Sequence, residues 1–254
     1  MPDLDTPPKS WLIGYGEWIF RTRNWAFPLF MLALFAGFKP VPYAADPSAD
    51  IWFDAIGVAV ALTGSLYRAW VIGLAYIKRG GVDRKVYADN LVTTGMFGVC
   101  RNPLYVGNAL VLVGLFLVHN NPWLYLLGGL VFGVSYWAIV TTEETYLRER
   151  FGHEYEEYCA RVNRFLPNFS RYAQSAEGHR FSWRRAVSKD HGSVVIWMLA
   201  AIALYIYEQA TWSPISLDSR DVSLSIIVSL VVIAVWGLIR ILKKSGAFNE
   251  VEDA

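Results

Sequence analysis

Residues 103–142 read PLYVGNALVLVGLFLVHNNPWLYLLGGLVFGVSYWAIVTT, a stretch without a single Asp, Glu, Lys or Arg. A helix needs about 20 mainly apolar residues to cross the hydrocarbon core of a bilayer. The stretch therefore predicts two membrane spans, at 103–119 and 123–142. Only Asn120, Asn121 and Pro122 separate them. Such a short connection predicts that the two helices form an antiparallel hairpin.

The whole chain shares this apolar character. Hydrophobic residues make up 54% of it and charged residues only 18%, whereas roughly a quarter of the residues of a soluble domain are charged. Four further stretches are long enough to span, and they lie at 25–43, 51–77, 193–209 and 224–242. We therefore expect an all-α fold, a polytopic bundle of about six transmembrane helices. The near-zero net charge gives no indication of a nucleic-acid partner.

The distribution of basic residues predicts the orientation of the bundle. With the N-terminus in the cytoplasm, all but three of the 23 Lys and Arg residues fall in cytoplasmic segments. The exceptions are Lys39 and Arg220 in outer loops and Arg68 within the second span. Cytoplasmic loops are normally enriched in basic residues, so this partition favours six spans and a cytoplasmic N-terminus. The N-terminal residues also lack the pattern of a cleavable secretory signal. We expect a multi-pass protein of the bacterial inner membrane.

The segments outside the spans divide the chain into three parts. Residues 1–24 are predicted to form an amphipathic helix in the headgroup region, since Trp11, Tyr15 and Trp18 recur on one helical face. Residues 25–169 form the predicted transmembrane core, and its fourth span continues into the cytoplasm as a helix. Residues 170–254 are a basic linker followed by two additional spans.

Polar residues gather where the central hairpin meets the cytoplasm. Asn102 and Pro103 form a favoured helix start, with Asn at the N-cap and Pro at the first helical position. A cap and a boundary arginine explain Arg101-Asn102-Pro103 without any function. Glu143 and Glu144 are harder to explain in this way, because two carboxylates end an apolar span on the basic side. A carboxylate beside Arg101 and free backbone N–H groups suits a zwitterionic ligand or a general base.

Together these segments make a longer motif. Residues 94–107, TGMFGVCRNPLYVG, fit G-x-[YF]-x-x-x-R-[HN]-P-x-Y-x-G, and residues 143–158, EETYLRERFGHEYEEY, fit E-E-x-x-L-x-x-x-F-G-x-x-Y-x-x-Y. With Asn121-Pro122 between them and Val162 and Pro167 after them, residues 90–169 resemble the C-terminal core of the isoprenylcysteine carboxyl methyltransferase and phospholipid methyltransferase superfamily.

The resemblance implies an integral membrane methyltransferase that uses S-adenosylmethionine in a cytoplasmic pocket. Its lipophilic acceptor, entering from the lipid, would be an isoprenylcysteine-like carboxylate, a phospholipid amine, or a small thiol or hydroxyl. Arg101 and Glu144 are the implied catalytic residues. The implied cofactor-binding residues are Gly95, Phe97, Val99, Asn102, Tyr105, Gly107, Glu143 and Glu144. Outside the motif's cofactor residues, Arg68, Tyr155 and Arg161 are candidates for contact with the substrate or its headgroup, and each also has a purely structural interpretation.

Two departures from the family pattern bear on the acceptor. Asn102 stands where many members have His, so a proton relay is not expected there. Many members that methylate prenylcysteine carry an Arg about one turn before the paired glutamates, and residues 139–142 provide none.

Two other classes remain open at this stage. Membrane sterol-type reductases that use NADPH have a similar C-terminal core, although the Glu143-Glu144 pair followed by Leu147 favours methyl transfer. A non-enzymatic scaffold would show a collapsed pocket at Arg101 and Glu144. No metal site is expected, because His153, His179 and His191 lack metal-ligand spacing. The oligomeric state is not predicted.

Overall fold

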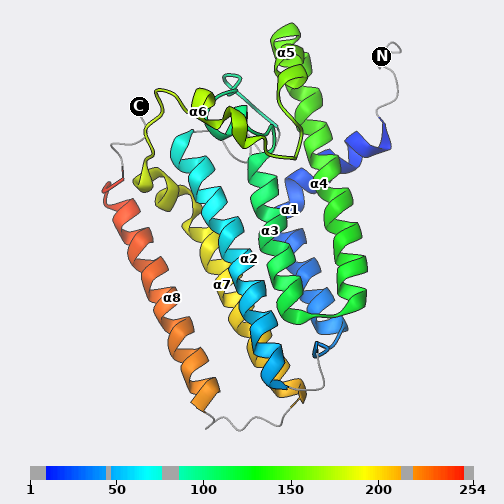
Figure 1. Ribbon diagram of the computed structural model, residues 1–254, viewed down its shortest axis with the longest axis vertical. Helices are drawn as coiled ribbons and strands as arrows, with labels where there is room; N and C mark the ends of the chain where they lie inside the picture. The colour runs from blue at the N-terminus through cyan, green and yellow to red at the C-terminus, as the bar shows by residue number, and fades with distance from the viewer. Residues whose placement is uncertain (1–9, 44–46, 76–85, 213–219, 249–254) are drawn as a thin grey trace, which may run out of the picture.

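The computed structural model describes residues 10–43, 47–75, 86–212 and 220–248 (Figure 1). These residues form helices and connecting segments, with no β-strand among them. The α-helices are α1 (Trp11–Gly37), α2 (Pro47–Leu74), α3 (Pro103–His119), α4 (Pro122–Phe151), α5 (His153–Arg161), α6 (Tyr172–Ser175), α7 (Trp183–Trp212) and α8 (Arg220–Lys244), and the 3₁₀ helices are η1 (Gly95–Gly98) and η2 (Phe169–Arg171).

Within the described residues, four helices are long and apolar enough to cross a membrane. These spans are Asp50–Leu74 in α2, Pro122–Phe151 in α4, Trp183–Thr211 in α7 and Arg220–Lys244 in α8. The shorter apolar helix α3 has 17 residues, about 25 Å at 1.5 Å per residue. The all-α, multi-pass prediction is thus confirmed. The count of six spans and the cytoplasmic N-terminus stay predictions.

Helices α2 and α3 pack at close range through glycines. Gly57 and Gly64 of α2 face Gly114 and Gly107 of α3. A Cβ atom at Gly114 would lie 2.4 Å from the carbonyl oxygen of Gly57, and one at Gly64 would lie 2.6 Å from that of Gly107. Small residues let helix backbones approach closely, which is a main source of packing energy within a bilayer. This contact fixes the position of α3, whose first turn carries the motif residues.

The predicted hairpin of α3 and α4 is confirmed. Asn120 adopts a left-handed conformation with φ of 42°, as is common just after a helix ends. The side chain of Asn121 then caps α4 by accepting hydrogen bonds from the backbone N–H groups of Trp123 and Leu124. Pro122 occupies the first helical position. At the other end of the hairpin, the start of α3 lies beside Glu143 and Glu144 of α4, about two turns before α4 ends.

Helix α1 differs from the sequence prediction. It runs without a break from Trp11 to Gly37, so no separate interfacial helix ends near residue 24. Figure 1 shows its first turns slanting outward before the helix runs along the bundle. Gly16 packs against α4, where a Cβ atom would lie 2.2 Å from Oγ1 of Thr142. Within the predicted aromatic face, Trp11 is exposed whereas the hydroxyl of Tyr15 hydrogen-bonds to that of Ser135.

The C-terminal helices are added to one side of this core. Helix α7 begins at Trp183, inside the stretch predicted to be a linker, and it packs against both α2 and α3. Helix α8 packs against α7 and lies at the edge of the bundle (Figure 1). At the end of α4, Gly152 with φ of 52° separates α4 from α5, so the predicted cytoplasmic continuation is two helices rather than one.

Candidate active site

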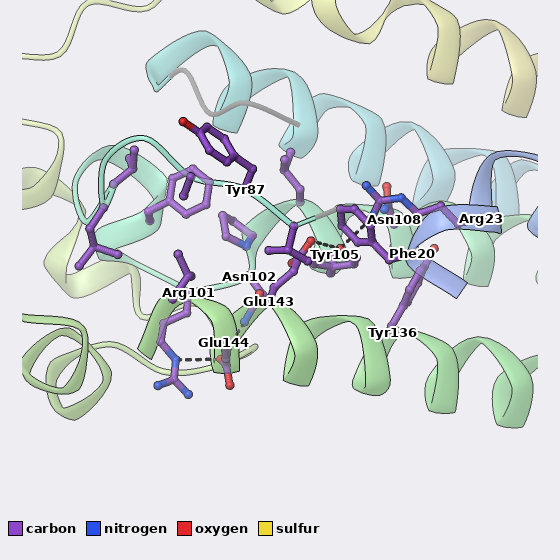
Figure 2. Close-up of a pocket in the computed structure, with 18 of the residues that line it drawn as sticks. Phe20, Arg23, Tyr87, Arg101, Asn102, Tyr105, Asn108, Tyr136, Glu143 and Glu144 are labelled. Atoms are coloured by element: carbon purple, nitrogen blue, oxygen red, sulfur yellow. Dashed lines mark hydrogen bonds and ion pairs between the residues drawn. The ribbon is translucent and has the colours of Figure 1, made fainter. Parts of the chain in front are cut away.

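A pocket of about 700 Å³ lies where the start of α3 meets the end of α4. Residues of α1, of the segment 86–92 and of α5 complete its wall. Figure 2 shows Arg101 and Glu144 together at one end of the pocket, with Tyr105, Arg23 and Tyr136 toward the other end. The pocket is thus open at the position where the scaffold alternative required it to be collapsed.

Glu144 is the centre of a cluster of opposite charges. Its Oε1 lies 3.5 Å from Nε of Arg101, and its Oε2 lies 3.0 Å from Nε of Arg164. The side-chain amide of Asn102 donates to Oε1 of Glu144 at 3.3 Å. One carboxylate between two guanidinium groups leaves a net positive charge, which suits a ligand carrying a carboxylate.

Arg164 comes from the irregular segment after α5 and is held firmly. Its guanidinium Cζ lies 4.2 Å from the ring centroid of Trp137, and its Nη2 donates to Oγ1 of Thr141 at 2.9 Å. Its carbonyl accepts a hydrogen bond from the side chain of Asn102. The backbone N–H of Arg101 donates to the carbonyl of Asn163. The segment 162–168 therefore runs along the start of α3 and positions Arg164 beside Glu144.

Asn102 lies at the predicted N-cap position, but its side chain does not cap the helix. It is the N-cap residue of α3, followed by Pro103 at the first helical position. Its side chain makes no capping hydrogen bond, because the amide points to Glu144 and to the carbonyl of Arg164 instead. The backbone conformation thus satisfies the helix start, and the amide is free to orient the carboxylate.

Glu143 has a separate set of partners. The hydroxyl of Tyr105 donates to Oε1 of Glu143 at 2.9 Å, and Nη1 of Arg23 in α1 donates to the Tyr105 oxygen at 3.1 Å. Consecutive residues of a helix point in directions about 100° apart. The two adjacent carboxylates therefore face different walls, with Glu143 toward α1 and Glu144 toward the segment 162–168.

Helix α5 and the neighbouring segments supply neutral groups. Burial raises the pKa of the Tyr155 and Tyr158 hydroxyls well above the ordinary tyrosine range, and the Tyr158 hydroxyl donates to the carbonyl of Phe97. Burial also raises the pKa of the Cys100 thiol to about 11. These groups stay protonated at neutral pH, so none of them provides a basic or nucleophilic anion.

The structure brings most of the predicted site residues together. Those that line the pocket are Arg68, Phe97, Arg101, Asn102, Tyr105, Glu143, Glu144 and Tyr155. Four others lie outside its lining. Gly107 packs against Arg68 and Gly64, Gly95 forms a turn with φ of 62°, Val99 is fully buried, and Arg161 is exposed on α5.

Several residues of the pocket region escaped sequence reasoning. Arg164, which pairs with Glu144, and Arg23, which lines the pocket, were not among the predicted site residues. Arg68 was a predicted site residue, but its partners were not predicted: it makes a buried ion pair with Asp190 of α7 and also donates to Asn108 of α3. No local pattern marks these pairings, because the partners lie far apart in the chain.

Comparisons with known proteins agree with this arrangement. Residues 53–154, from α2 to the start of α5, match the model of the phospholipid methyltransferase family. The chain is therefore a multi-pass membrane methyltransferase, and the reductase alternative is not supported. The match reaches further toward the N-terminus than the predicted region, 90–169, because it includes most of α2.

Curated relatives support the same class. The chain is 28% identical over 178 residues to the nickel-cobalt-cadmium resistance protein of Alcaligenes xylosoxydans xylosoxydans, over 65% of this chain and 76% of that protein. It is 33% identical over 117 residues to the cobalt-zinc-cadmium resistance protein of Cupriavidus metallidurans, over 46% and 49%. It is 31% identical over 125 residues to a probable protein-S-isoprenylcysteine O-methyltransferase of Oryza sativa subsp. indica, over 46% and 63%.

These matches support the resemblance of the motif to the superfamily of isoprenylcysteine carboxyl methyltransferases and phospholipid methyltransferases. It spans about half to three quarters of the length of these three relatives. No solved structure gives a significant match.

Proposed function

We propose that this chain transfers the methyl group of S-adenosylmethionine to a lipophilic acceptor in the pocket between α3 and α4. The observation that carries the proposal is the alternation of charges Arg101, Glu144 and Arg164 at one end of a pocket of about 700 Å³. The amino-acid part of S-adenosylmethionine is a zwitterion. A carboxylate flanked by two guanidinium groups can pair with both of its charges.

The polar groups of the pocket have unused hydrogen-bonding capacity for such a ligand. The Nε atoms of Arg101 and Arg164 are buried and have no hydrogen-bond partner among the described residues, although both lie within ion-pair distance of Glu144. Buried polar atoms are nearly always hydrogen-bonded in proteins. Phe97, Leu147 and Tyr155 provide apolar wall nearby, which suits the remainder of the cofactor.

The chain contributes orientation more than covalent chemistry. Bound S-adenosylmethionine supplies an electrophilic methyl group on a sulfonium centre. Arg101, Asn102 and Glu144 would hold the ligand's charged end, and the tyrosines of α5 would exclude water. Methyl transfer mainly requires that nucleophile and methyl group be aligned at close range in a dry site. Tyr105, fixed by Glu143 and Arg23, would form the wall toward the acceptor.

A second, apolar pocket of about 370 Å³ supports entry of the acceptor from the lipid. It lies between α3 and α4 and shares Tyr105 and Tyr136 with the larger pocket. Apart from these tyrosines, its lining consists of Val106, Ala109, Leu110, Val113, Gly133, Trp137 and Phe165. An apolar chain lying there would bring its polar end to the Tyr105 side of the larger pocket.

Among acceptors, the arrangement favours one that carries an oxygen nucleophile such as a carboxylate. Family members that act on prenylcysteine have an Arg one turn before the paired glutamates, where this chain has residues 139–142. Arg164 approaches that position from the other side and donates to Thr141. The rice relative is itself named as an O-methyltransferase. A guanidinium beside the reacting group would orient a carboxylate for attack.

The pocket is expected to face the cytoplasm of a bacterial cell. Arg101, Arg148 and Arg164 lie at or beyond the pocket end of α3 and α4, and basic residues are enriched on the cytoplasmic side of membrane proteins. Two of the relatives are bacterial. This orientation requires α1 and α3 to cross the membrane with the four longer helices, which gives the six spans predicted from the sequence.

The test is binding and turnover by the purified full chain. Calorimetry with S-adenosylmethionine and with NADPH measures binding, and methyl-labelled S-adenosylmethionine incubated with bacterial lipid extract measures transfer. Glu144→Gln keeps the shape but removes the charge, so we expect transfer to fall at least tenfold with little loss of folded protein. Glu149→Gln is the control, because Glu149 is exposed on the last turns of α4.

Two results would contradict the proposal. Binding of NADPH without S-adenosylmethionine would assign the pocket to a reductase. If folded wild-type protein binds neither S-adenosylmethionine nor NADPH, the result would favour a non-enzymatic scaffold that has retained the fold.

A further inference from the structure

Three carboxylates meet at the end of the bundle remote from the pocket. Asp50 and Asp54 lie one turn apart at the start of α2, and Glu208 lies in the last turns of α7. One carboxylate oxygen from each residue lies within 4.8 Å of one from each of the others. Figure 1 shows the start of α2 and the end of α7 next to each other, at the opposite end of the molecule from α5.

Glu208 is the decisive member of this cluster. It is 0% exposed, and neither of its carboxylate oxygens has a hydrogen-bond partner among the residues that the structure describes. The same holds for Oδ1 of Asp54. Asp50 is 3% exposed, and its Oδ1 accepts a hydrogen bond from the backbone N–H of Tyr43 at 2.9 Å. Burial of an unpaired carboxylate costs several kcal/mol, on the order given by mutational and transfer data.

No basic side chain compensates these charges within the described part of the chain. Among the ion pairs of the described residues, Arg68 pairs with Asp190, Glu144 with its two arginines, and His153 with Glu157. None of them involves the three carboxylates. A stable fold therefore needs another positive charge, or added protons, at this cluster.

We propose that Asp50, Asp54 and Glu208 bind a single divalent cation. Each residue supplies one carboxylate oxygen, and water completes the coordination. Oxygen-only ligand sets suit Ca²⁺, Mg²⁺ and Mn²⁺, whereas soft thiolate ligands are absent from the cluster. Co²⁺ and Zn²⁺ are expected to compete, since most oxygen and nitrogen sites bind them more tightly than Mn²⁺.

The site was not predictable from the sequence. The expectation of no metal rested on histidine spacing. Glu208 lies at least 154 positions after Asp50 and Asp54 in the sequence. A carboxylate in an apolar helix does mark a functional position, and Asp54 is such a residue in α2. Only the packing of α2 against α7 brings Glu208 to it.

The competing explanation is protonation. A proton shared between Asp54 and Glu208 would lower the charge of the cluster without any metal. The two explanations differ in their dependence on added cation, because only a cation-binding cluster gains stability as the cation concentration rises.

Mn²⁺ is the probe of choice, since electron paramagnetic resonance measures free Mn²⁺ directly. The detergent-purified full chain, first stripped with EDTA, is titrated with Mn²⁺ at constant ionic strength. We expect one saturable site per wild-type chain and a rise in Tm on binding. Glu208→Gln and Asp54→Asn are each expected to weaken Mn²⁺ binding at least tenfold and to abolish the Tm rise. Competition with Ca²⁺, Co²⁺ and Zn²⁺ then ranks the cations.

Glu149→Gln and Glu144→Gln are the matched controls and should bind Mn²⁺ like wild type, because both lie at the pocket end. Asp54 is only partly buried, so Asp54→Asn tests the site even where Glu208→Gln does not fold. The proposal is overturned if wild-type protein shows no saturable Mn²⁺ binding up to about 1 mM, which is the highest dissociation constant typical of oxygen-ligated Ca²⁺ sites. Equal Mn²⁺ binding by wild type and by Asp54→Asn overturns it as well.

Discussion

Replacement of Arg164 by alanine is the sharpest test of the site geometry, because the chain provides a matched control three residues away. Arg164 contacts Glu144 at 3.0 Å, Thr141 at 2.9 Å and the ring of Trp137. Arg161 is exposed, and its Nε donates only to the carbonyl of Glu157 one turn earlier. The two arginines carry the same charge and are close in the chain, but only Arg164 contacts a residue that lines the pocket.

The expected magnitude follows from the contact with Glu144. A hydrogen bond or pair that involves a charged group contributes about 1.5–3 kcal/mol, which corresponds to roughly 10- to 150-fold in an equilibrium constant. Arg164→Ala should therefore weaken S-adenosylmethionine binding or methyl transfer by that factor. Arg161→Ala should stay within about fivefold of wild type, since exposed polar contacts contribute about 0–1 kcal/mol.

Calorimetry and transfer of labelled methyl groups measure both variants in one detergent preparation, with Tm as a check on folding. Arg164→Lys distinguishes charge from geometry, because lysine cannot reach Glu144 and Thr141 through one planar group. Equal losses in the two alanine variants would refute the argument, since the effect would then come from bulk positive charge near the membrane.

Two further predictions concern packing and thiol chemistry. Gly114→Ala should lower the free energy of unfolding by about 1–3 kcal/mol, since its Cβ would lie 2.4 Å from the backbone of Gly57. Thermal unfolding measures the change. Gly129→Ala in α4 is the control and should be neutral or stabilising, because no atom lies within 4 Å of its Cβ. N-ethylmaleimide at pH 8 should label Cys159 but not Cys100, as measured by intact mass. The Cys100 thiol is buried, and burial raises its pKa to about 11. Modification of Cys100 in folded protein would contradict the burial.

The sequence predicted those parts of the fold that depend on neighbouring residues. The hairpin of α3 and α4 follows from two apolar runs joined by Asn120, Asn121 and Pro122, where the end of α3 and the cap of α4 are local features. The continuity of α1 did not follow, because Arg21 and Arg23 look like a membrane boundary in sequence whereas the helix carries both through without a break. Charges mark where a chain leaves the apolar phase, and they do not mark where a helix ends.

The same limit applies to the site: residues placed by local pattern were predicted, and residues placed by distant contacts were not. Arg101 and Glu144 were identified because the ends of a hairpin must meet, and the motif supplied their spacing. Arg164 was not identified, since its position depends on hydrogen bonds between the segments 162–168 and 99–102 that leave no pattern in either. Gly107 shows the reverse case. Its place in the motif suggested contact with a cofactor, whereas its missing side chain makes room for Arg68.

Arg68 connects α7 to the pocket. Arg68 belongs to α2 and lines the pocket, and the carboxylate that balances its charge belongs to Asp190 of α7. The family match ends at residue 154, so this part of the pocket wall depends on a helix beyond the matched core. A buried cation whose partner is removed costs about 3–5 kcal/mol. The charge that the pocket presents on the α2 side is therefore set by α7, and the family core alone cannot determine which acceptors tolerate that wall.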